Sequence, residues 1–569
     1  RSLSLSAQCR SHADWLVGIN FTRFYTCIAQ DKGFQGTLSL GRVQTVAFSI
    51  IYNRCMDIEN FSPLTHFGLD VILECSNGVY SGEWIIPEGL KNEQGYCIDK
   101  RKAEQVQSIV KSSQGIVKEV LIEDKSEVAP LLFSLSMLQT FSSKKWGYSA
   151  KQVLNACQYL YEELKSLTYP RTDCSYLSEG DFKDALEISA VIGSSTSIDI
   201  NNLPLNFTSK PRCYNDSKTT AHTGIIPTLC PPDFKKFDSL SSKEKQASLI
   251  GDRSVLENIY NTVAIRFLAQ FMPKHDVQST KIITGINGYE FKTTGKVITA
   301  LGWKLLLHDE STKEHKHSLP VITKGESIKI MGSTVSEKKT KPPEYFTEGT
   351  LIAALSNISN YVDDQKIRQK LRETDGIGTE ATRADIIERI IKVGYVRVDG
   401  KKLIVTPLGR DVYPFFPIYF KTPAMTAIWE SALQGIAEAR LDHNAFERNI
   451  ISWTETQIKK LKNSPPDIKV NIDDKYQCKN CSSTLIRKKG KYGNFWACIN
   501  RDCGQSYNDF KLSPLYPLEG DGNDCSECKT NNRMGIMKTR VMKENRDKGQ
   551  PAKVFLGCDQ YPECKHAEW

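Results

Sequence analysis

Long apolar runs are missing from this 569-residue sequence. No stretch approaches the about 18 consecutive apolar residues of a membrane-spanning helix, and the N-terminal region lacks the apolar core of a signal peptide. Hydrophobic residues make up 40% of the chain and charged residues 25%, which excludes a disordered or a collagen-like protein. At about 150 residues per domain, the length predicts roughly three to five folded domains. We therefore expect a multidomain protein with no membrane partner.

A P-loop for nucleotide binding is missing as well, because the pattern G-x-x-x-x-G-K-[ST] occurs nowhere in the chain. A large excess of one charge is also absent: 75 Lys and Arg residues face 66 Asp and Glu residues, which gives a formal net charge of +9. An excess of this size fits a nucleic-acid-binding protein, but it also fits an ordinary solvated surface. Charge alone therefore leaves the partner open.

The 17 cysteines are unevenly distributed, and their spacing carries more information than their number. Nine are scattered singly between Cys9 and Cys230, a pattern that suits the reducing cytosol rather than disulfide bonding. The other eight lie between Cys478 and Cys564 and include two C-x2-C pairs. Four thiolates fill the tetrahedral coordination of zinc and leave no open position for catalysis. We expect two structural Zn²⁺ sites, formed by Cys478, Cys481, Cys498 and Cys503 and by Cys525, Cys528, Cys558 and Cys564.

Aromatic residues such as Trp496 and Phe555 lie between these cysteines, together with the basic run Arg487 to Lys489. Aromatic faces can stack on bases and cations can neutralise phosphates, a combination that suits single-stranded nucleic acid. The same aromatic residues can equally fill the small core around each zinc ion. Both interpretations stay open.

Hydrophobic periodicity outlines the elements of the remaining chain. Apolar residues repeat at helical spacing over residues 43–58, and residues 379–394 combine a capped start with a Gly stop. A hairpin signal at Asp399-Gly400 follows. Strand character appears in residues 64–128 and again in 276–335, with helical patterns between them. This order predicts one domain that is interrupted by another.

Three short motifs carry chemistry but are weak signals by themselves. Tyr169 precedes a proline, which favours an extended backbone, and Arg171 follows shortly after it. His222 is a lone histidine in a segment that contains Gly and Pro. Arg42 stands at a turn-to-helix junction, where backbone N–H groups and the helix dipole favour phosphate. By residue type alone, such tyrosines and histidines are more often structural than functional.

Taken in order, five segments resemble motifs of the type IA DNA topoisomerases, with bacterial topoisomerase III as the most similar branch. The likeness runs from about residue 7 to residue 460, and the zinc tail is similar to that of bacterial topoisomerase I. The segments are Asp14 to Asn20, Gly41 to Thr45, Thr168 to Asp173, Ala221 to Thr228, and Gly376 to Arg383.

The resemblance implies a multidomain α+β fold of toroidal shape, with a helical base, a β-rich arch and a helical domain that carries the catalytic tyrosine. Zinc ribbons follow at the C-terminus. The implied domains are the helical base in 1–63 and 346–460, the arch in 64–128 and 274–345, the tyrosine domain in 129–273, a linker in 461–477, and zinc ribbons in 478–510 and 525–569.

The resemblance also implies an isomerase that cleaves and rejoins one DNA strand without ATP. Tyr169 would attack a phosphodiester and become linked to the 5′-phosphate, so that the new ester stores the bond energy. Arg171 would stabilise charge on the phosphate, and His222 would position the reacting groups or transfer a proton. The implied path for single-stranded DNA comprises Thr22, Gln30, Thr37, Ser39, Leu40, Gly41, Arg42, Val43, Gln44 and Thr45, with Gln30 standing where the family pattern has Arg.

Members of this family begin with a Toprim domain, which holds Mg²⁺ on an acidic cluster and supplies a general acid. This sequence begins at Arg1 rather than at a Met. We therefore expect an N-terminally truncated chain that binds single-stranded DNA but is inactive alone. A separate Toprim-containing chain would supply the missing domain. The resemblance further implies a monomer in the bacterial cytoplasm, associated with the nucleoid.

The alternative hypothesis is a catalytically dead remnant that binds single-stranded DNA and keeps its zinc ribbons. The presence of Tyr169, Arg171 and His222 favours the enzyme, although a recently decayed gene would retain these residues too. Trapping of a covalent complex with DNA, after this chain is mixed with a Toprim domain, discriminates between the two hypotheses.

Overall fold

The computed structural model describes most of the chain, in two compact units. The first unit comprises Arg1–Val17 and Leu40–Ile451, and the second comprises Gly18–Ser39 and Ser452–Trp569. The described residues are 2–31, 34, 36–307, 319–372, 376–468, 476–483, 485–490, 493–498, 500, 502–510, 513–542 and 553–568.

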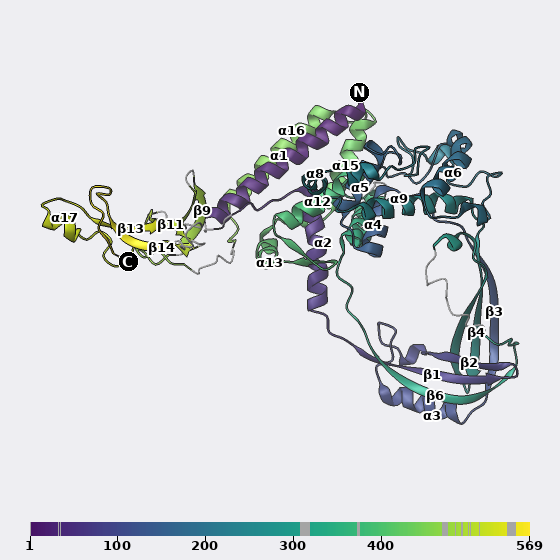
Figure 1. Cartoon of the computed structure of the whole chain (residues 1–569). Helices are drawn as coiled ribbons and strands as arrows, with labels where there is room; N and C mark the ends of the chain where they lie inside the picture. The colour runs from purple at the N-terminus through teal and green to yellow at the C-terminus, as the bar shows by residue number, and fades with distance from the viewer. Residues whose placement is uncertain are drawn as a thin grey trace. The chain divides into compact units, whose positions relative to one another are not determined.

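Six antiparallel strands of the first unit close into a barrel, with β1 (Thr65–Cys75) between β2 and β6 (Figure 1). Leu69, Val71 and Leu73 of β1 are fully buried, because alternate side chains of a strand point to the same face. Helix α3 (Lys100–Lys111) packs against β1 and β6. The other strands, in the order in which they follow β1 around the barrel, are β2 (Gly78–Ile85), β5 (Tyr289–Ala300), β4 (His275–Ile286), β3 (Gly115–Glu127) and β6 (Ser327–Lys339).

The chain leaves the barrel at the end of β3 and returns at the start of β4. Glu127 and His275 pair across these two strands, so the two ends of the intervening segment are neighbours. The segment is helical and has a core of its own, in which Leu132, Phe267 and Leu268 are fully buried. Its helices are α4 (Leu135–Trp146), α5 (Ala150–Glu162), α6 (Ala185–Ser195), α7 (Lys235–Asp238), α8 (Ser242–Ser248) and α9 (Arg253–Leu268).

The region after β6 is again mostly helical and packs against α2 (Arg42–Glu59), which precedes β1. Phe48 of α2 stacks on Tyr395 with ring centroids 5.0 Å apart and meets Tyr413 edge to face at 5.5 Å. The elements of this region are α10 (Glu348–Ser356), α11 (Gln365–Arg372), α12 (Glu380–Lys392), β7 (Val396–Asp399), β8 (Lys402–Val405), α13 (Pro407–Val412), α14 (Ile418–Lys421) and α15 (Ala424–Ala437).

Two long helices, α1 (Ser2–Asp31) and α16 (His443–Asn463), contribute residues to both units. Within the second unit, the rings of Phe21 on α1 and Trp453 on α16 lie 5.9 Å apart. Helix α16 extends to Asn463 and therefore into the predicted linker.

The remainder of the second unit consists of two small sheets. The first has the strand order β12-β11-β10-β9 and the second the order β13-β14-β15. Their elements, with the short helix between them, are β9 (Leu485–Gly490), β10 (Gly493–Cys498), β11 (Ser506–Phe510), β12 (Ser513–Pro514), α17 (Ser526–Thr530), β13 (Met537–Met542), β14 (Lys553–Cys558) and β15 (Ala567–Glu568).

Candidate functional site

Tyr169 lies on an extended segment that follows α5. Leu167 in this segment forms an antiparallel β-bridge with Pro227, and the Thr168 N–H donates a hydrogen bond to the Ile226 carbonyl at 3.0 Å. The Thr168 hydroxyl accepts a second hydrogen bond from the Ile226 N–H, also at 3.0 Å. These contacts place side by side two segments that are far apart in the sequence.

His222 enters the site through this pairing. The centroids of the His222 and Tyr169 rings lie 4.4 Å apart, with 39° between the ring planes. On α5, Tyr161 meets Tyr169 edge to face at 5.6 Å. Tyr169 is half-buried and His222 is exposed, so the protein holds this pair and leaves it accessible to a substrate.

Arg171 supplies a cation next to the tyrosine. Its side chain is exposed, and its Nε donates a hydrogen bond to Oε1 of Gln158 on α5 at 3.2 Å. Thr220 ties the two segments together, because its hydroxyl lies 3.3 Å from Asp173 Oδ1 and 3.2 Å from the His222 carbonyl oxygen. A guanidinium held in this way can bind a phosphate oxygen.

The sequence did not point to Gln158, Tyr161 and Thr220 as members of the site. Gln158 and Tyr161 lie three residues apart on a helix and therefore share a face. That spacing predicts a common neighbour but not which segment it is. Thr220 carries no signal of its own in the sequence.

The residues of the predicted DNA path lie partly in each unit. In the second unit, Thr22 is half-buried, Gln30 and Thr37 are exposed and Ser39 is buried. The side-chain amide of Gln30 donates a hydrogen bond to the Gly36 carbonyl at 3.2 Å.

In the first unit, the path continues into the start of α2. Gly41 and Val43 are half-buried, and the Gly41 N–H donates to the hydroxyl of Thr45 at 3.1 Å. The other residues of this stretch are buried, namely Leu40, Arg42, Gln44 and Thr45.

Arg42 is held by carboxylates of the protein. Its Nε and one terminal nitrogen donate to Asp14 at 2.9 and 3.1 Å, and its other terminal nitrogen donates to Glu430 at 3.0 Å. Its guanidinium also lies 5.2 Å from the ring of Trp429. Burial acts to lower the pKa of Arg42, but the hydrogen bonds and charges of the two carboxylates outweigh it and the pKa is raised. This guanidinium already has two anionic partners, and a phosphate would have to share it with them. A phosphate contact at Arg42 stays a prediction.

The first four cysteines predicted to bind zinc form one set. Their Sγ atoms all lie within 4.8 Å of one another, with Cys481 and Cys498 3.4 Å apart and Cys478 and Cys503 3.8 Å apart. Tetrahedral zinc with Zn–S bonds of about 2.3 Å places its sulfur ligands about 3.8 Å apart. These side chains therefore fit a four-coordinate structural zinc ion.

The second four cysteines form a similar set, again within 4.8 Å. Cys528 and Cys558 lie 3.5 Å apart, and Cys525 and Cys564 lie 3.8 Å apart. A Cβ atom on Gly535 would come within 2.7 Å of the Cys528 sulfur and 2.9 Å of the Cys558 sulfur. Glycine at this position leaves the space that the metal ligands need.

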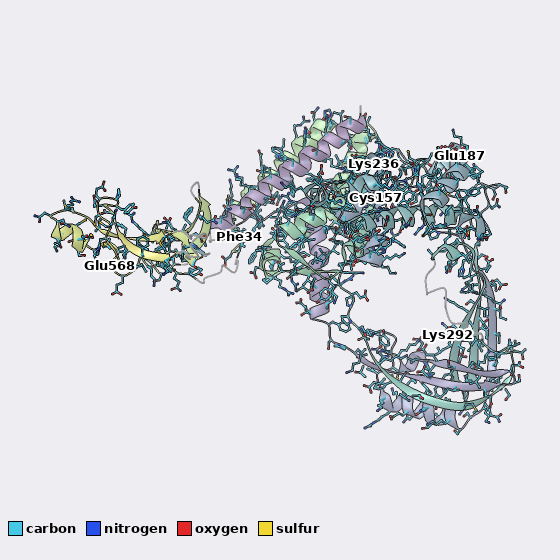
Figure 2. The ribbon with its side chains drawn as sticks, viewed as in Figure 1. Phe34, Cys157, Glu187, Lys236, Lys292 and Glu568 are labelled. Atoms are coloured by element: carbon cyan, nitrogen blue, oxygen red, sulfur yellow. The ribbon has the colours of Figure 1, made fainter. Side chains whose placement is uncertain are left out.

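The cysteines outside these sets show a different environment. Cys157 on α5 is fully buried among the helices (Figure 2), and burial raises its pKa to about 12. Such a thiol stays protonated and acts as a small apolar core residue.

The resemblance implies a cluster of carboxylates that binds Mg²⁺. Among the described residues, the groups of three or more potential ligands are the two cysteine sets. The described part of the chain therefore does not fit the acidic Mg²⁺ cluster that the resemblance implies.

Comparison with known proteins identifies the family. A DNA topoisomerase family model matches residues 1–447, and a model of the topoisomerase DNA-binding C4 zinc finger matches residues 475–509 and 542–569. This chain belongs to the type IA DNA topoisomerase family. The two cysteine sets together hold eight cysteines, and the matched zinc-finger segments contain six of them. Cys525 and Cys528 lie outside these segments.

Curated relatives support this assignment. The topoisomerase is 34% identical to DNA topoisomerase 3 of Vibrio cholerae over 474 residues, which cover 81% of this chain and 71% of the relative. It is 36% identical to DNA topoisomerase 3 of Pasteurella multocida over 472 residues, covering 79% and 70%. For DNA topoisomerase 3 of Bacillus subtilis the values are 32% over 510 residues, covering 88% and 66%. The chain thus spans 66–71% of the length of these relatives.

A solved structure of full-length topoisomerase I from Thermotoga maritima has the same fold. It matches with a TM-score of 0.56 at 20% identity and covers 90% of this chain and 76% of that chain. The mixed α and β fold with C-terminal zinc ribbons, predicted from the sequence, is confirmed. Within the described residues, no helix has the length and apolar character needed to cross a membrane.

Proposed function

We propose that this topoisomerase cleaves and rejoins one strand of DNA through Tyr169. The Tyr169 oxygen attacks a phosphodiester, an O–P bond to the 5′-phosphate forms, and the P–O3′ bond breaks to release a 3′-hydroxyl. Attack of that hydroxyl on the phosphotyrosine reverses both bond changes. Because the ester keeps the bond energy, the cycle needs no ATP.

The observation that carries this proposal is the accessible contact between Tyr169 and His222, 4.4 Å between ring centroids, with Arg171 on the same segment. A free tyrosine has a pKa near 10, so its hydroxyl needs help at neutral pH. We propose that His222 positions the hydroxyl or accepts its proton, and that Arg171 stabilises charge on the phosphate in the transition state.

We propose that single-stranded DNA reaches this site along Thr22 to Thr45 and that the zinc ribbons bind it as well. Each zinc ion would be held by four thiolates and would supply structure rather than chemistry. For the complete reaction, Mg²⁺ and a general acid would belong to a Toprim domain. We propose that the protein works in the bacterial cytoplasm and, because its substrate is DNA, is associated with the nucleoid; we further propose that it is a monomer.

The test is covalent trapping, in the presence of a Toprim-containing chain, on a single-stranded oligonucleotide labelled at its 3′ end. Rapid denaturation should leave the label on the protein, because the 5′-phosphate side stays linked to Tyr169. Tyr169→Phe should lose the adduct, whereas Tyr161→Phe, which changes the neighbouring ring, should keep it. Trapping by Tyr169→Phe at the wild-type level would show that the nucleophile is another residue.

A second candidate function is binding of single-stranded DNA without strand cleavage. The match of the ribbon segments to the DNA-binding C4 zinc finger model favours binding in either case. The two functions separate when trapping and plasmid relaxation are measured with the chain alone and after addition of a Toprim-containing chain. DNA binding without an adduct under both conditions would support the second function.

A further inference from the structure

Two carboxylates reach from the region after β6 into the helical segment that carries Tyr169. Glu348 is the first residue of α10, and its Oε2 accepts a hydrogen bond from the Ala150 N–H at 2.7 Å. Glu380 is the first residue of α12, and its Oε2 accepts one from the Ser136 N–H at 2.6 Å. Ala150 and Ser136 lie in the first turns of α5 and α4, whose N–H groups have no partner within their own helix. Each glutamate therefore caps a helix from a different part of the chain.

Both carboxylates are hydrogen-bond acceptors at helix N-termini. Each carboxylate sits at the N-terminus of its own helix and faces the N-terminus of a second one, and both helix ends carry partial positive charge. The local caps of α4 and α5 use other N–H groups, because Ser134 accepts from the Met137 N–H and Ser149 accepts from the Gln152 N–H. The N–H groups of Ser136 and Ala150 therefore stay available to the glutamates.

Glu380 is in addition held in place by a buried arginine. Arg383 is 1% exposed and donates to Glu380 Oε1 at 2.6 Å. The same terminal nitrogen lies 2.9 Å from the Ser136 hydroxyl. The carboxylate is thus fixed between the backbone of α4 and this guanidinium.

The two helices that are capped in this way are the ones that contact the catalytic segment. At the start of α4, the Leu135 N–H donates to the Thr172 carbonyl at 3.0 Å. On α5, Gln158 accepts from Arg171 and Tyr161 packs against Tyr169. A shift of either helix start would therefore be transmitted to the nucleophile or to its cation.

We propose that Glu348 and Glu380 are positioning residues for Tyr169 and Arg171, acting through the N-termini of α5 and α4. Neither glutamate touches the reacting groups. The inference rests on the proposed function for what Tyr169 does, but the positioning itself can be measured without turnover.

The first experiment is hydrogen exchange, followed by mass spectrometry, on the full chain and its variants. Glu380→Ala should accelerate exchange in residues 135–138 by about 10- to 100-fold, the effect of removing a hydrogen bond to a charged group. Glu348→Ala should do the same for residues 150–153, and both should raise exchange in 166–173. Glu348→Gln and Glu380→Gln keep an oxygen acceptor and should restore most of the protection.

Two internal references keep the result decisive. Exchange in β1, residues 65–75, reports whether the first unit is folded, and Glu187→Gln on α6 is a control on an exposed side chain. If an Ala variant raises exchange in β1 as much as in 166–173, that variant is generally unfolded and the matching Gln variant is used instead. A Gln variant that loses as much protection in 166–173 as the Ala variant refutes positioning. Unchanged exchange in 166–173 in folded Ala variants also overturns the proposal.

The second experiment separates chemistry from binding. With a single-stranded oligonucleotide and a Toprim-containing chain, the Ala variants should form the Tyr169 adduct more slowly, by up to about 100-fold, the loss expected from a misplaced catalytic group, with Kd for the oligonucleotide unchanged. The Gln variants should recover the rate. A parallel loss of affinity would indicate a general structural role instead. If the wild type forms no adduct even with the Toprim-containing chain, the proposed function fails, while the exchange data still decide the positioning.

Discussion

Arg383 has the largest side chain among the fully buried residues of the described structure. Its Nε donates to the Ile377 carbonyl at 3.2 Å, and a terminal nitrogen donates to Ser136 and Glu380. A buried charge is tolerated only when partners replace the water that it has lost. This guanidinium therefore joins α12 to α4, and the packing of the two helices depends on its ion pair with Glu380.

Replacement of Arg383 by Met should lower the free energy of unfolding by about 3–5 kcal/mol, because it leaves the Glu380 charge buried without its partner. Chemical denaturation followed by tryptophan fluorescence measures this change. The matched control is Arg397→Met, whose pair with Asp399 is exposed and should be worth less than about 1 kcal/mol. Adding Glu380→Gln to Arg383→Met should recover part of the loss; no recovery would show that the cost is not electrostatic.

Glu348 predicts a pH dependence of stability. Burial raises the pKa of this carboxyl, the hydrogen bond from Ala150 opposes the shift, and the charge of Glu388 adds to it. The folded state then keeps its proton to a higher pH than the unfolded chain does. Stability from this group is present below the ordinary Glu pKa and is lost as pH rises through the raised pKa.

Glu348→Gln removes this titration, so the variant should gain stability relative to wild type as pH rises from acid towards neutral. Urea unfolding of both proteins at several pH values gives the difference directly. Glu344→Gln changes an exposed neighbour and should run parallel to wild type. A difference between Glu348→Gln and wild type that does not vary with pH would contradict the raised pKa.

At the scale of elements, the second zinc ribbon has almost no core without its metal. Its buried cluster consists of Met537 and Leu556 together with Cys525, Cys528, Cys558 and Cys564. So few apolar side chains cannot offset the entropy of ordering the chain, and a structural zinc ion commonly supplies the remainder.

Removal of zinc by a chelator should therefore unfold β13 and β14 while the barrel stays intact. Hydrogen exchange should rise to the unfolded rate in residues 537–542 and 553–558 and stay slow in 65–75. Gly535→Ala should make zinc loss easier, because the added methyl group competes with two ligand sulfurs for space; Gly89→Ala, where the methyl group meets open space, is the control. Retained protection after verified zinc loss would show that the sheet is stable without metal.

Many elements could be predicted from their local pattern. The strand character predicted in residues 64–128 includes β1, and the helix predicted over 43–58 is α2. The hairpin predicted at Asp399-Gly400 is formed by β7 and β8, with Gly400 at a φ of 61°. These features depend on residues near in sequence, so short-range periodicity and turn chemistry suffice.

The arrangement of those elements could not be predicted in the same way. Periodicity tells which face of β1 is buried but not that β6 is its partner. The contact between Tyr169 and His222 depends on the pairing of Thr168 with Ile226, and only the family resemblance joined these residues beforehand. The ion pairs of Arg42 could not be predicted either, because its partners Asp14 and Glu430 come from other helices.

At the scale of the whole first unit, the helical segment is an insertion into the barrel. β3 and β4 pair along their full lengths up to Glu127 and His275, so the backbone departs and returns at adjacent points. Partners in antiparallel strands lie only about 5 Å apart, a gap that a hairpin turn spans.

Replacement of residues 129–273 by a short Gly-containing turn should therefore leave a folded barrel with β3 and β4 as an ordinary hairpin. Slow exchange in β1, β2 and β5 should match that of the full chain, while circular dichroism should lose the helical signal of the deleted segment and keep its β signal. The same deletion with a Pro placed in the middle of β4 is the control and should prevent closure, because Pro removes a hydrogen-bond donor from a paired strand. Loss of β1 protection in the first variant would show that the barrel needs the helical segment.

The same insertion sets the order in which the barrel can form during translation. Thr65 of β1 pairs with Lys339 of β6, and Ile116 of β3 pairs with Ser327, so the first three strands wait for partners encoded far downstream. At elongation rates of about 5–20 residues per second, the ribosome needs on the order of 10 s to pass from Glu127 to His275. During that time the nascent chain presents open strand edges, which are prone to join other chains. Closure of the barrel is thus a late, long-range event, and slow elongation through the helical segment would lengthen the period of risk.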